Sequence, residues 1–195
     1  TALYLDCDVI VEGDILELKA VDFSNNEAIA AVEDISRSPA YELLNIPANH
    51  YFNSGMMLLN LEYWRSMEIS EKVRQFKETY HHLLTTNDQC ALNGVLWNNW
   101  KRLSPKWNQQ SGIYKRRFRK KGTGYTEAEI IEGIGNPQII HFVGSRKPWR
   151  ADCPHPLRNR YHYYRNFLDP AYKKPSPLEA FRAAVRSGTV RHLLK

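Results

Sequence analysis

The sequence predicts an α/β fold for its first 150 residues. Short apolar runs that are typical of strands alternate with longer segments whose apolar residues recur at every third and fourth position, as in amphipathic helices. With 195 residues, of which 43% are hydrophobic, the chain is long enough for one substantial core. We therefore expect one globular unit at 1–150, followed by a basic, aromatic extension at 151–195. Strands are predicted at 2–5, 28–32, within 51–61 and at 139–143, and helices at 61–84 and 89–96.

Two acids follow the first predicted strand. Asp6 and Asp8 come directly after an apolar run, and Val9 and Ile10 continue it. Side chains two residues apart on a strand point to the same side, and the residue between them, here Cys7, points away. Both carboxylates would then reach one hard divalent cation. Two acids at this spacing also occur in solvated turns, but acids at the end of an apolar strand usually have a functional role, such as binding or catalysis.

The next elements are short. Residues 12–18 fit a turn and a short helix, and residues 28–32 fit a buried strand that ends near Asp34. Residues 36–49 contain two prolines, which disrupt regular structure, so we expect a loop there.

The segment from 51 to 84 predicts a strand followed by a helix. Asn53 and Gly55 at the start of the strand suggest a close approach of the backbone to a ligand, although a plain turn before a buried strand has the same residues. In the helix predicted at 61–84, Asn60 and Ser70 are candidate caps.

A second helix is predicted from Gln89 to Leu96. Thr86 or Asn87 is its expected cap, and Asp88 falls in its first turn, where an acid also complements the helix dipole. Farther along, the basic run at 115–124 is predicted to be an exposed loop, with an acceptor-phosphate contact as the second interpretation.

The last predicted strand delivers a histidine. His141 ends an apolar run, and a glycine turn with Gly144 and Lys147 follows it. Imidazole suits transition metals and carboxylates suit magnesium and manganese, so a set of two aspartates and this histidine favours manganese. Lys147 would meet a phosphate oxygen as a point charge. An ordinary half-buried histidine and a solvated lysine are the alternative for each residue alone.

Positive charge is concentrated at the end of the chain. Residues 142–195 hold 12 Lys and Arg against 3 Asp and Glu, a net charge of +9, whereas residues 1–141 hold −3. Aromatic residues interleave with these basic ones, which suits the surface of an anionic membrane or a lipid-linked phosphate. A basic helix that packs on its own domain is the alternative. Nucleic acid would attract the same charge, but we predict no nucleic-acid partner.

The cysteines indicate a reducing compartment. Cys7, Cys90 and Cys153 are odd in number and lack metal-binding spacing, and Cys7 is expected to be buried behind the acids. The sequence has no apolar run of 18 residues and no signal-like start. We therefore predict a cytoplasmic protein, peripheral at the inner membrane face.

Four of these motifs, taken together and in this order, resemble the retaining glycosyltransferases of family 8. They are the strand with Asp6 and Asp8, the Phe-Asn-Ser-Gly strand at 52–55, the helix start with Asp88 and Gln89, and His141 with the glycine turn at 144–149. This family contains glycogenin and the bacterial lipopolysaccharide and lipooligosaccharide galactosyl- and glucosyltransferases. The resemblance covers residues 1–150, and the basic tail is similar to the membrane-associated end of the bacterial members in composition. It implies a GT-A fold, a Rossmann-like mixed sheet with flanking helices. It also implies a UDP-glucose or UDP-galactose donor bound through Mn²⁺ (or Mg²⁺).

The resemblance assigns roles to individual residues. Asp6, Asp8 and His141 match the metal ligands of the family. Asp88 and Gln89 match the catalytic positions beside the reacting sugar. The substrate-binding positions are matched by Asp34 (with Glu33 as its neighbouring alternative), Asn53, Ser54, Asp88, Gln89, Gly144 and Lys147.

The implied reaction transfers a hexose, with retention of configuration, to a glycan or glycolipid such as a lipopolysaccharide core. A divalent cation and a lysine would stabilise the leaving diphosphate, so no protein acid is needed to protonate it. Asp88 is the only evident nucleophilic carboxylate, which favours attack on the same face over a covalent intermediate.

In the family, a nucleotide-binding half precedes the metal acids, whereas this sequence starts at Thr1, just before them. We therefore expect a C-terminal fragment of a longer enzyme with an apolar sheet edge. A catalytically silent module that binds an acidic glycan or a membrane is the alternative. A metal-dependent phosphohydrolase of the haloacid dehalogenase type is a lesser one, because Val9 and Ile10 continue the strand where the loop of such a site would turn.

Overall fold

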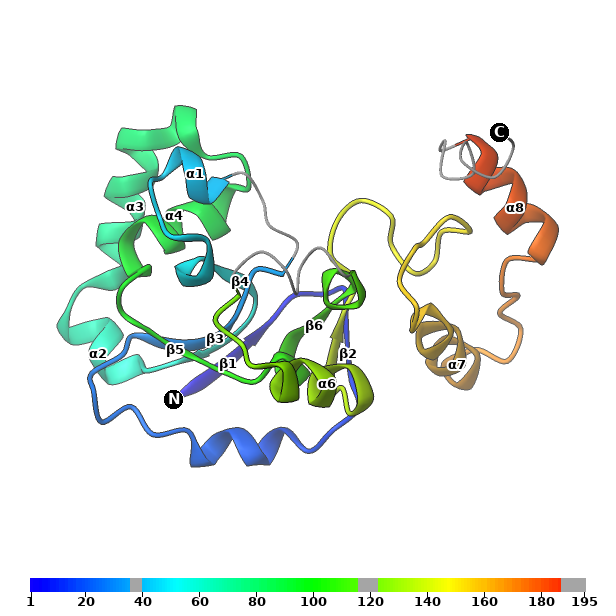
Figure 1. Cartoon of the computed structure of the whole chain (residues 1–195), viewed down its shortest axis with the longest axis horizontal. Coiled ribbons are helices and arrows are strands. Elements are labelled where there is room, and N and C mark those ends of the chain that lie inside the picture. The colour runs from blue at the N-terminus through cyan, green and yellow to red at the C-terminus, as the bar shows by residue number, and fades with distance from the viewer. Residues whose placement is uncertain (36–39, 116–122, 187–195) are drawn as a thin grey trace. The chain divides into compact units, whose positions relative to one another are not determined.

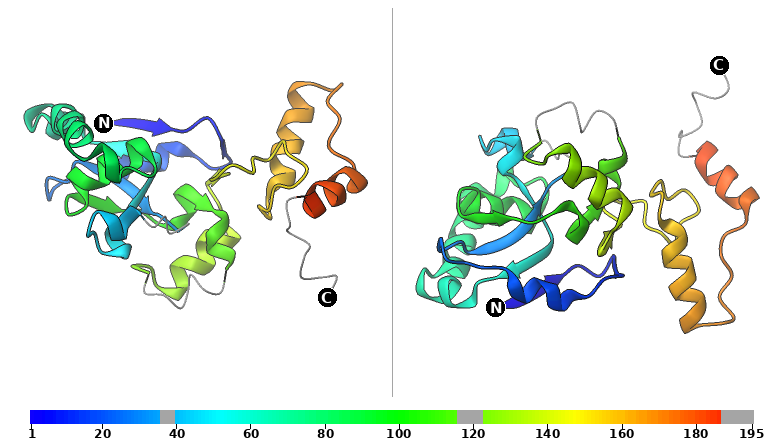
Figure 2. Two further views of the ribbon diagram at one scale, coloured as in Figure 1. Left: turned by 90° about the horizontal axis from the view of Figure 1, so that it is seen from above. Right: turned by 60° about the horizontal axis from the view of Figure 1, so that its bottom comes forward.

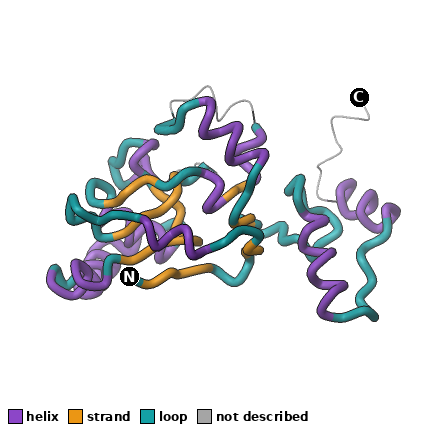
Figure 3. Tube along the Cα trace, turned by 90° about the horizontal axis from the view of Figure 1, so that it is seen from below, coloured by secondary structure: helices purple, strands orange, loops and turns teal. Residues whose placement is uncertain are grey.

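The computed structural model describes residues 1–35, 40–115 and 123–186, so most of the basic run at 115–124 lies outside the described residues. The chain divides into two compact units, Thr1–His141 and Phe142–Lys195, which Figure 1 draws from blue to yellow-green and from yellow to red. The described strands all belong to the first unit, and the described part of the second unit consists of helices and loops (Figure 3).

A four-stranded sheet forms the centre of the first unit, with the strand order β1-β4-β3-β5. The strands β1 (Ala2–Leu5) and β3 (Ile29–Glu33) pair antiparallel with β4 (Phe52–Leu59), and β5 (Trp100–Arg102) pairs parallel with β3. β1 lies at one edge of this sheet (Figure 2). Because β4 runs opposite to β1 and β3, its first residues lie at the same end of the sheet as the last residues of β1 and β3.

A three-stranded sheet has the order β2-β7-β6. In this sheet β2 (Val9–Val11) pairs antiparallel with β7 (Ile139–His141), and β6 (Gln109–Gln110) pairs parallel with β7. The chain thus leaves one sheet after β1 and enters the other at β2, with a turn at Cys7 and Asp8. The prediction of one continuous strand with Cys7 buried was wrong. Cys7 is exposed because it lies in this turn and not on the inner face of a strand.

Helices cover both faces of the four-stranded sheet. One face packs against α3 (Ile69–Tyr80) and α4 (Asn87–Leu96), and the other packs against η4 (Pro105–Asn108) and α6 (Glu127–Gly135). Every residue of β3 is therefore buried, and alternate residues of this strand face the two layers. The predicted α/β class, with a mixed sheet between helices, is confirmed.

The helix predicted at 61–84 is interrupted. It consists of α2 (Leu61–Ser66), α3 and a 3-10 turn, η3 (His81–Leu83). Glu68 between α2 and α3 has a φ of 50°, in the left-handed region, which a continuous right-handed helix does not allow. The apolar periodicity predicted helical structure correctly but did not detect this break.

The predicted caps have mixed outcomes. The side chain of Asn60 caps α2 by accepting from the Tyr63 N–H at 3.2 Å, as predicted. Ser70 is not a cap, because it lies inside α3 and its hydroxyl accepts from the indole N–H of Trp64 at 2.7 Å. Thr86 occupies the cap position of α4, without a capping hydrogen bond from its side chain.

Shorter helical turns complete the first unit. The short helix predicted near 12–18 is η1 (Ile15–Ala20), which the Asp14 side chain caps. The loop predicted at 36–49 contains α1 (Ala40–Leu43) and η2 (Ala48–His50) among its described residues, so that prediction was partly wrong. One more turn, η5, spans Ser111–Tyr114.

Up to Arg186, the described part of the second unit has two helices, α7 (Arg158–Leu168) and α8 (Pro177–Arg186). An aromatic contact joins Phe142 to His155, with ring centroids 4.9 Å apart. On α7, His162 stacks on the ring of Tyr172 and lies 2.8 Å from its hydroxyl. Within the described ranges, no helix has the length and apolar character that crossing a membrane requires.

Candidate active site

Polar side chains meet where β1 and β3 end and β4 begins. Asp6 follows β1, Asp34 follows β3 and Asn53 is the second residue of β4. His141 ends β7, whose partner β2 begins just after the acidic turn, so the pairing of the second sheet brings the histidine to the acids. Residues that are distant in the sequence therefore share one end of the first unit.

Asp6, Asp8 and His141 form a group that can hold a metal ion. Their ligand atoms lie within 4.8 Å of one another. The Nε2 atom of His141 is 3.5 Å from Asp8 Oδ1 and 3.8 Å from Asp6 Oδ2. An octahedral ion with bonds of about 2.1 Å places neighbouring ligand atoms about 3 Å apart and opposite ones about 4.2 Å apart. Small side-chain movements would therefore close the group around an ion.

Gly55 explains how the histidine fits so close to β4. A Cβ atom at this position would lie 2.1 Å from His141 Cε1 and 2.9 Å from Asp6 Oδ2, both well inside van der Waals contact. Only glycine leaves room for the imidazole and the carboxylate together. Gly55 lies within β4 and not in a turn before it, and the close approach that the structure shows there is to His141 and Asp6.

Tyr4 on β1 supports one of the acids. Its hydroxyl donates to Asp6 Oδ1 at 2.9 Å, which leaves Oδ2 on the side of His141. That hydrogen bond, with partial burial and the nearby charges of Asp6, Asp88 and Cys7, raises the pKa of Tyr4 to about 12. The hydroxyl thus remains a donor at neutral pH.

A line of buried hydrogen bonds leads from His141 to Asp34. His141 Nδ1 lies 2.9 Å from Asn108 Oδ1, and Asn108 Nδ2 donates to Asn53 Oδ1 at 2.8 Å. Asn53 Nδ2 then donates to Gln89 Oε1 at 3.0 Å, and Gln89 Nε2 donates to Asp34 Oδ2 at 3.0 Å. Three amides thus connect His141, a candidate metal ligand, to Asp34, the acid for which the family resemblance implies binding of the donor sugar.

Asn93 holds this arrangement to the sheet. Its side chain accepts from the Phe52 N–H at 2.8 Å, and it donates to the carbonyls of Phe52 at 2.9 Å and Gln89 at 2.8 Å. These bonds fix the first turns of α4 against the start of β4. Gln89 consequently lies beside Asn53.

A second buried cluster lies on the other side of the same strand end. The Glu33 carboxylate accepts from the Thr123 hydroxyl at 3.1 Å and from the Gly124 N–H at 2.9 Å, and it lies 3.9 Å from Arg102 Nε. The Tyr125 hydroxyl accepts from the Glu33 N–H and donates to the Leu103 carbonyl. Burial raises the pKa of Tyr125, so its hydroxyl stays protonated in this cluster.

Asp88 and Gln89 are adjacent on α4 but have different surroundings. Gln89 is buried in the line of amides, whereas Asp88 is exposed in the first turn of the helix. The pKa of Tyr4 is raised mainly by its hydrogen bond to Asp6, and the charge of Asp88 adds a smaller contribution. Ser54 contributes its backbone N–H, which donates to Gln89 Oε1 at 3.2 Å.

Gly144 and Lys147 belong to the second unit. Gly144 has a φ of +87°, which favours glycine, and is exposed. Lys147 Nζ donates to the Phe142 carbonyl at 3.0 Å, and this bond closes the turn between them. The predicted glycine turn is present in this unit.

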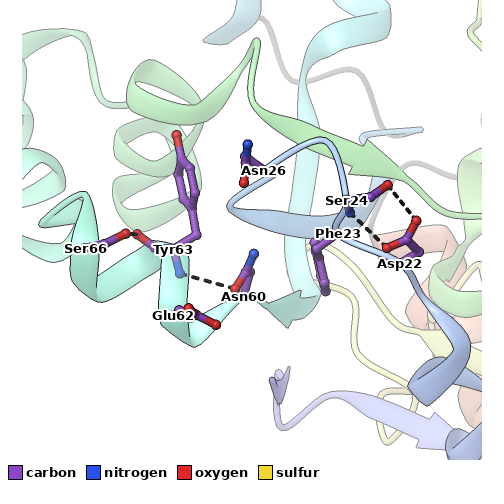
Figure 4. Close-up of a pocket in the computed structure, with 8 residues that line it drawn as sticks. All are labelled: Asp22, Phe23, Ser24, Asn26, Asn60, Glu62, Tyr63 and Ser66. Atoms are coloured by element: carbon purple, nitrogen blue, oxygen red, sulfur yellow. Dashed lines mark hydrogen bonds between the residues drawn. The ribbon is translucent and has the colours of Figure 1, made fainter.

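A hollow of about 450 Å³ lies at the other end of the four-stranded sheet (Figure 4). It is lined by the segment before β3, by Asn60 and by residues along α2. Much of its polar lining is already engaged: Asp22 accepts from Ser24, and Asn60 caps α2 through Tyr63. Since β4 separates Asn60 from Asn53 by about 23 Å at a rise of roughly 3.3 Å per residue, this hollow is not part of the candidate site.

Sequence reasoning missed three residues of this site. Asn108, Asn93 and Tyr4 each bond to a predicted site residue or to its backbone. Asn108 lies in η4, between a proline turn and a two-residue strand, where no periodicity marks it. The alternation along β1 would place Tyr4 and Asp6 on the same side, which was the one available signal.

Solved structures define the class of protein to which this fold belongs. The galactosyltransferase LgtC, in complex with donor and acceptor sugar analogues, superposes with a TM-score of 0.67 at 23% identity, over 83% of this chain and 59% of that one. The glycosyltransferase GlyE of Streptococcus pneumoniae TIGR4 gives a TM-score of 0.64 at 24% identity, over 89% and 44%. The predicted GT-A fold is thereby confirmed.

Residues 1–153 match the model of glycosyl transferase family 8, and the chain belongs to this family. It is 35% identical over 168 residues to general stress protein A of Bacillus subtilis strain 168, over 85% of this chain and 58% of that protein. It is 32% identical over 152 residues to the lipopolysaccharide 1,2-glucosyltransferase of Escherichia coli, over 75% of this chain and 44% of that protein. The chain therefore spans about half the length of these two relatives.

Proposed function

We propose that the chain is the metal- and sugar-binding part of a retaining hexosyltransferase. The enzyme would move glucose or galactose from UDP to a glycan acceptor such as a lipopolysaccharide core. The observation that carries this proposal is the Asp6, Asp8 and His141 group, joined by buried amides to Asp34. Family membership supports it, as do the activities in the names of two relatives, a lipopolysaccharide 1,2-glucosyltransferase and a lipopolysaccharide 1,3-galactosyltransferase.

Asp6, Asp8 and His141 would hold Mn²⁺ or Mg²⁺, with manganese favoured by the imidazole. When bound, the cation supplies charge that stabilises the departing diphosphate. Tyr4 would keep Asp6 oriented toward the ion by its hydrogen bond to Oδ1. Lys147, in the turn that starts at Gly144, is proposed to bind the diphosphate as a point charge.

The amides beside Asp34 would bind the donor hexose. Gln89 donates one N–H hydrogen to Asp34, and its side chain is also hydrogen-bonded to the Tyr51 hydroxyl. The Gln89 amide would thus orient the Asp34 carboxylate toward the sugar hydroxyls. Asp34 and Asn53 also offer acceptor capacity at the same strand ends. The backbone of Ser54 holds the Gln89 oxygen, which fixes the direction of that amide.

Asp88 would stabilise the positive charge that develops at the anomeric carbon. Its carboxylate is exposed in the first turn of α4, next to the buried Gln89. Gln89 is a poor nucleophile, so we propose same-face attack with the leaving phosphate as base, in preference to a covalent intermediate. One solved LgtC structure is that of an active-site mutant in which glutamate replaces a glutamine. This supports testing Gln89 and Asp88 by substitution.

The second unit is proposed to contact an anionic membrane at the cytoplasmic face. Residues 142–195 carry a net charge of +9. Phe167 and Leu168 at the end of α7 are 78% and 76% exposed, and Leu178 and Phe181 on α8 are also exposed. Basic residues with exposed apolar ones suit an anionic lipid surface.

Vesicle binding tests the membrane contact. The chain should sediment with vesicles that contain anionic lipid and not with purely zwitterionic ones. The replacement Phe167→Ser should weaken this binding, whereas Leu16→Ser, at a residue of the first unit that is 57% exposed, should not. Equal sedimentation with both kinds of vesicle would contradict an electrostatic membrane contact.

Calorimetric titration of the chain with UDP, with and without Mn²⁺, tests the transferase proposal. Binding that requires Mn²⁺ supports it, and absence of binding in both conditions would leave the silent glycan- or membrane-binding module. Membership of family 8 argues against the phosphohydrolase alternative. In a transfer assay, Asp88→Asn should lower kcat and leave the fold intact, because this side chain is exposed.

A further inference from the structure

The hydrogen bonds between Asn108 and Asp34 all run in one direction. Each of the three amides donates to the neighbour on the Asp34 side, and Asn53 and Gln89 also accept from the neighbour on the His141 side. All five residues are shielded from water, which would otherwise compete for these bonds. Their exposed fractions are 3% for His141, 0% for Asn108, 6% for Asn53, 8% for Gln89 and 2% for Asp34.

Backbone groups of β4 fix this direction. The N–H of Ser54 donates to Gln89 Oε1 at 3.2 Å, and the N–H of Gly55 donates to Asn53 Oδ1 at 3.1 Å. A backbone N–H can only donate, so the atoms facing it must be the amide oxygens. The –NH₂ groups of Asn53 and Gln89 therefore point away, toward Gln89 and Asp34. The orientation of these two amides follows from the chain itself and does not depend on an arbitrary choice of amide flip.

The fixed direction determines which nitrogen of His141 carries the proton. Asn53 Oδ1 accepts from Asn108, so Asn108 presents its –NH₂ to Asn53 and its oxygen to His141 Nδ1. An oxygen with no hydrogen can only accept, so Nδ1 must be the protonated nitrogen. The lone pair of the neutral ring is then on Nε2, the atom 3.5 Å from Asp8.

We infer that Asn108 is a positioning residue that sets the tautomer of His141 and thereby directs Nε2 at the cation. The Asn108 oxygen faces Nδ1 of His141 and not the acids, so Asn108 would act through the imidazole ring. The carboxylate of Asp34, at the far end, polarises every amide in the same direction, because each one donates toward that negative charge. The inference rests on the proposed function only in taking the group at Asp6, Asp8 and His141 as a cation site.

Two substitutions separate the parts that Asn108 plays. Asn108→Asp keeps an oxygen that accepts from Nδ1 and loses the donor to Asn53. Asn108→Leu removes both bonds at a similar volume. Loss of a residue that orients a metal-bound histidine typically weakens metal binding 10- to 100-fold. We expect this loss for Asn108→Leu, and a loss below about threefold for Asn108→Asp, since carboxylate–histidine–metal arrangements bind well.

Gln109, the next residue in the chain, provides a matched structural control. It is also 0% exposed, but its side chain donates to the Tyr114 hydroxyl at 2.9 Å and to the Gly133 carbonyl at 2.9 Å, outside the line from His141 to Asp34. Gln109→Leu should lower the melting temperature and leave the Mn²⁺ affinity of the folded chain within about twofold. This control separates loss of stability from loss of orientation.

The readouts are the Mn²⁺ dissociation constant, measured by electron paramagnetic resonance of the free ion without donor, and the His141 tautomer. The tautomer is measured by ¹H–¹⁵N correlation spectra of the metal-free chain, with His141 assigned from His141→Gln. Protonated Nδ1 is expected in the unsubstituted chain and in Asn108→Asp. A folded Asn108→Leu variant that binds Mn²⁺ as tightly as the unsubstituted chain would overturn the inference. If that variant does not fold, the tautomer decides: a His141 ring protonated at Nε2 in the unsubstituted chain would overturn the inference.

These outcomes are distinct from failure of the proposed function. A chain that binds Mn²⁺ and responds to Asn108 as expected, but neither binds UDP nor transfers a sugar, would contradict the transferase and leave Asn108 in its role. A chain that transfers a hexose, and whose Asn108→Leu variant keeps its Mn²⁺ affinity, would support the transferase and contradict the role of Asn108.

Discussion

The two buried polar clusters at the end of β3 lead to different groups. One runs from Asp34 through three amides to His141 and ends at the acids of the candidate cation site. The other centres on Glu33 and ends on backbone groups and on Arg102. In both clusters a buried carboxylate accepts hydrogen bonds, so neither burial nor hydrogen bonding of the carboxylate distinguishes them. What distinguishes them is where they end. The first cluster leads to three candidate ligand atoms that face one another, and the second ends on Thr123, Gly124 and Arg102, within the fold.

This difference predicts that changes in the first cluster affect ligand binding and that changes in the second affect stability. The largest expected effect is that of Asp8→Asn, which removes a ligand charge while keeping nearly the same shape. We expect at least about a 100-fold loss of Mn²⁺-dependent transfer, with the melting temperature nearly unchanged. Asp14→Asn, at an acid that caps η1, should not alter transfer. Retained turnover in Asp8→Asn would count against the metal assignment.

The next largest effect is expected for Gly55→Ala. The added Cβ would lie 2.1 Å from His141 Cε1, so the ring must move away from the acids. Mn²⁺ affinity, measured by electron paramagnetic resonance, should fall about 10- to 100-fold, as for the loss of a group that orients a ligand. Gly135→Ala is the control, because a Cβ at that position meets nothing within 4 Å. Similar affinities in both variants would show that His141 does not need this close approach.

For the second cluster, Glu33→Gln should reduce the free energy of unfolding. The carboxylate is 1% exposed and accepts two hydrogen bonds beside Arg102, whose side chain is 30% exposed and partly screened by solvent. A loss of about 2 kcal/mol is expected for these charged hydrogen bonds. Urea unfolding measures it, and the Mn²⁺ dissociation constant should not change. A large change in Mn²⁺ affinity would mean that the two clusters are coupled.

The smallest effect is expected for Tyr4→Phe, at the edge of the first cluster. This change removes the hydrogen bond to Asp6 Oδ1 from a side chain that is 41% exposed, so water can replace it. A single hydrogen bond of this kind contributes about 1 kcal/mol or less, so Mn²⁺ should bind up to about fivefold more weakly. Titration of Mn²⁺ into both proteins checks this. Tighter binding in the phenylalanine variant would mean that the hydroxyl competes with the ion for Asp6.

Much of the fold was predictable because its signals are local. The apolar runs that became β1, β3, β4 and β7 and the acid in the first turn of α4 are patterns of neighbouring residues. Asn60 was predicted as a cap for the same reason. The failures involve backbone states without a local signal, such as the left-handed Glu68 and the turn that exposes Cys7.

The candidate site was predictable at its charged ends and not at its centre. Asp6, Asp8, His141 and Asp34 lie at or just beyond the ends of apolar runs, where polar groups are costly to bury and therefore informative. Asn108 follows a proline turn, and its role depends on atoms of Asn53 and His141 that lie 55 and 33 residues away. Its neighbours in the sequence do not indicate those partners.

The sequence by itself determined which charged and polar residues lie at the ends of strands, because strand alternation and hydrophobic burial act between near neighbours. Only the tertiary structure decided that two sheets meet at the acidic turn, that Gly55 makes room for the imidazole, and that amide oxygens and hydrogens align from His141 to Asp34. Hydrogen-bond direction depends on the relative positions of whole strands, and those positions are set by packing across the core.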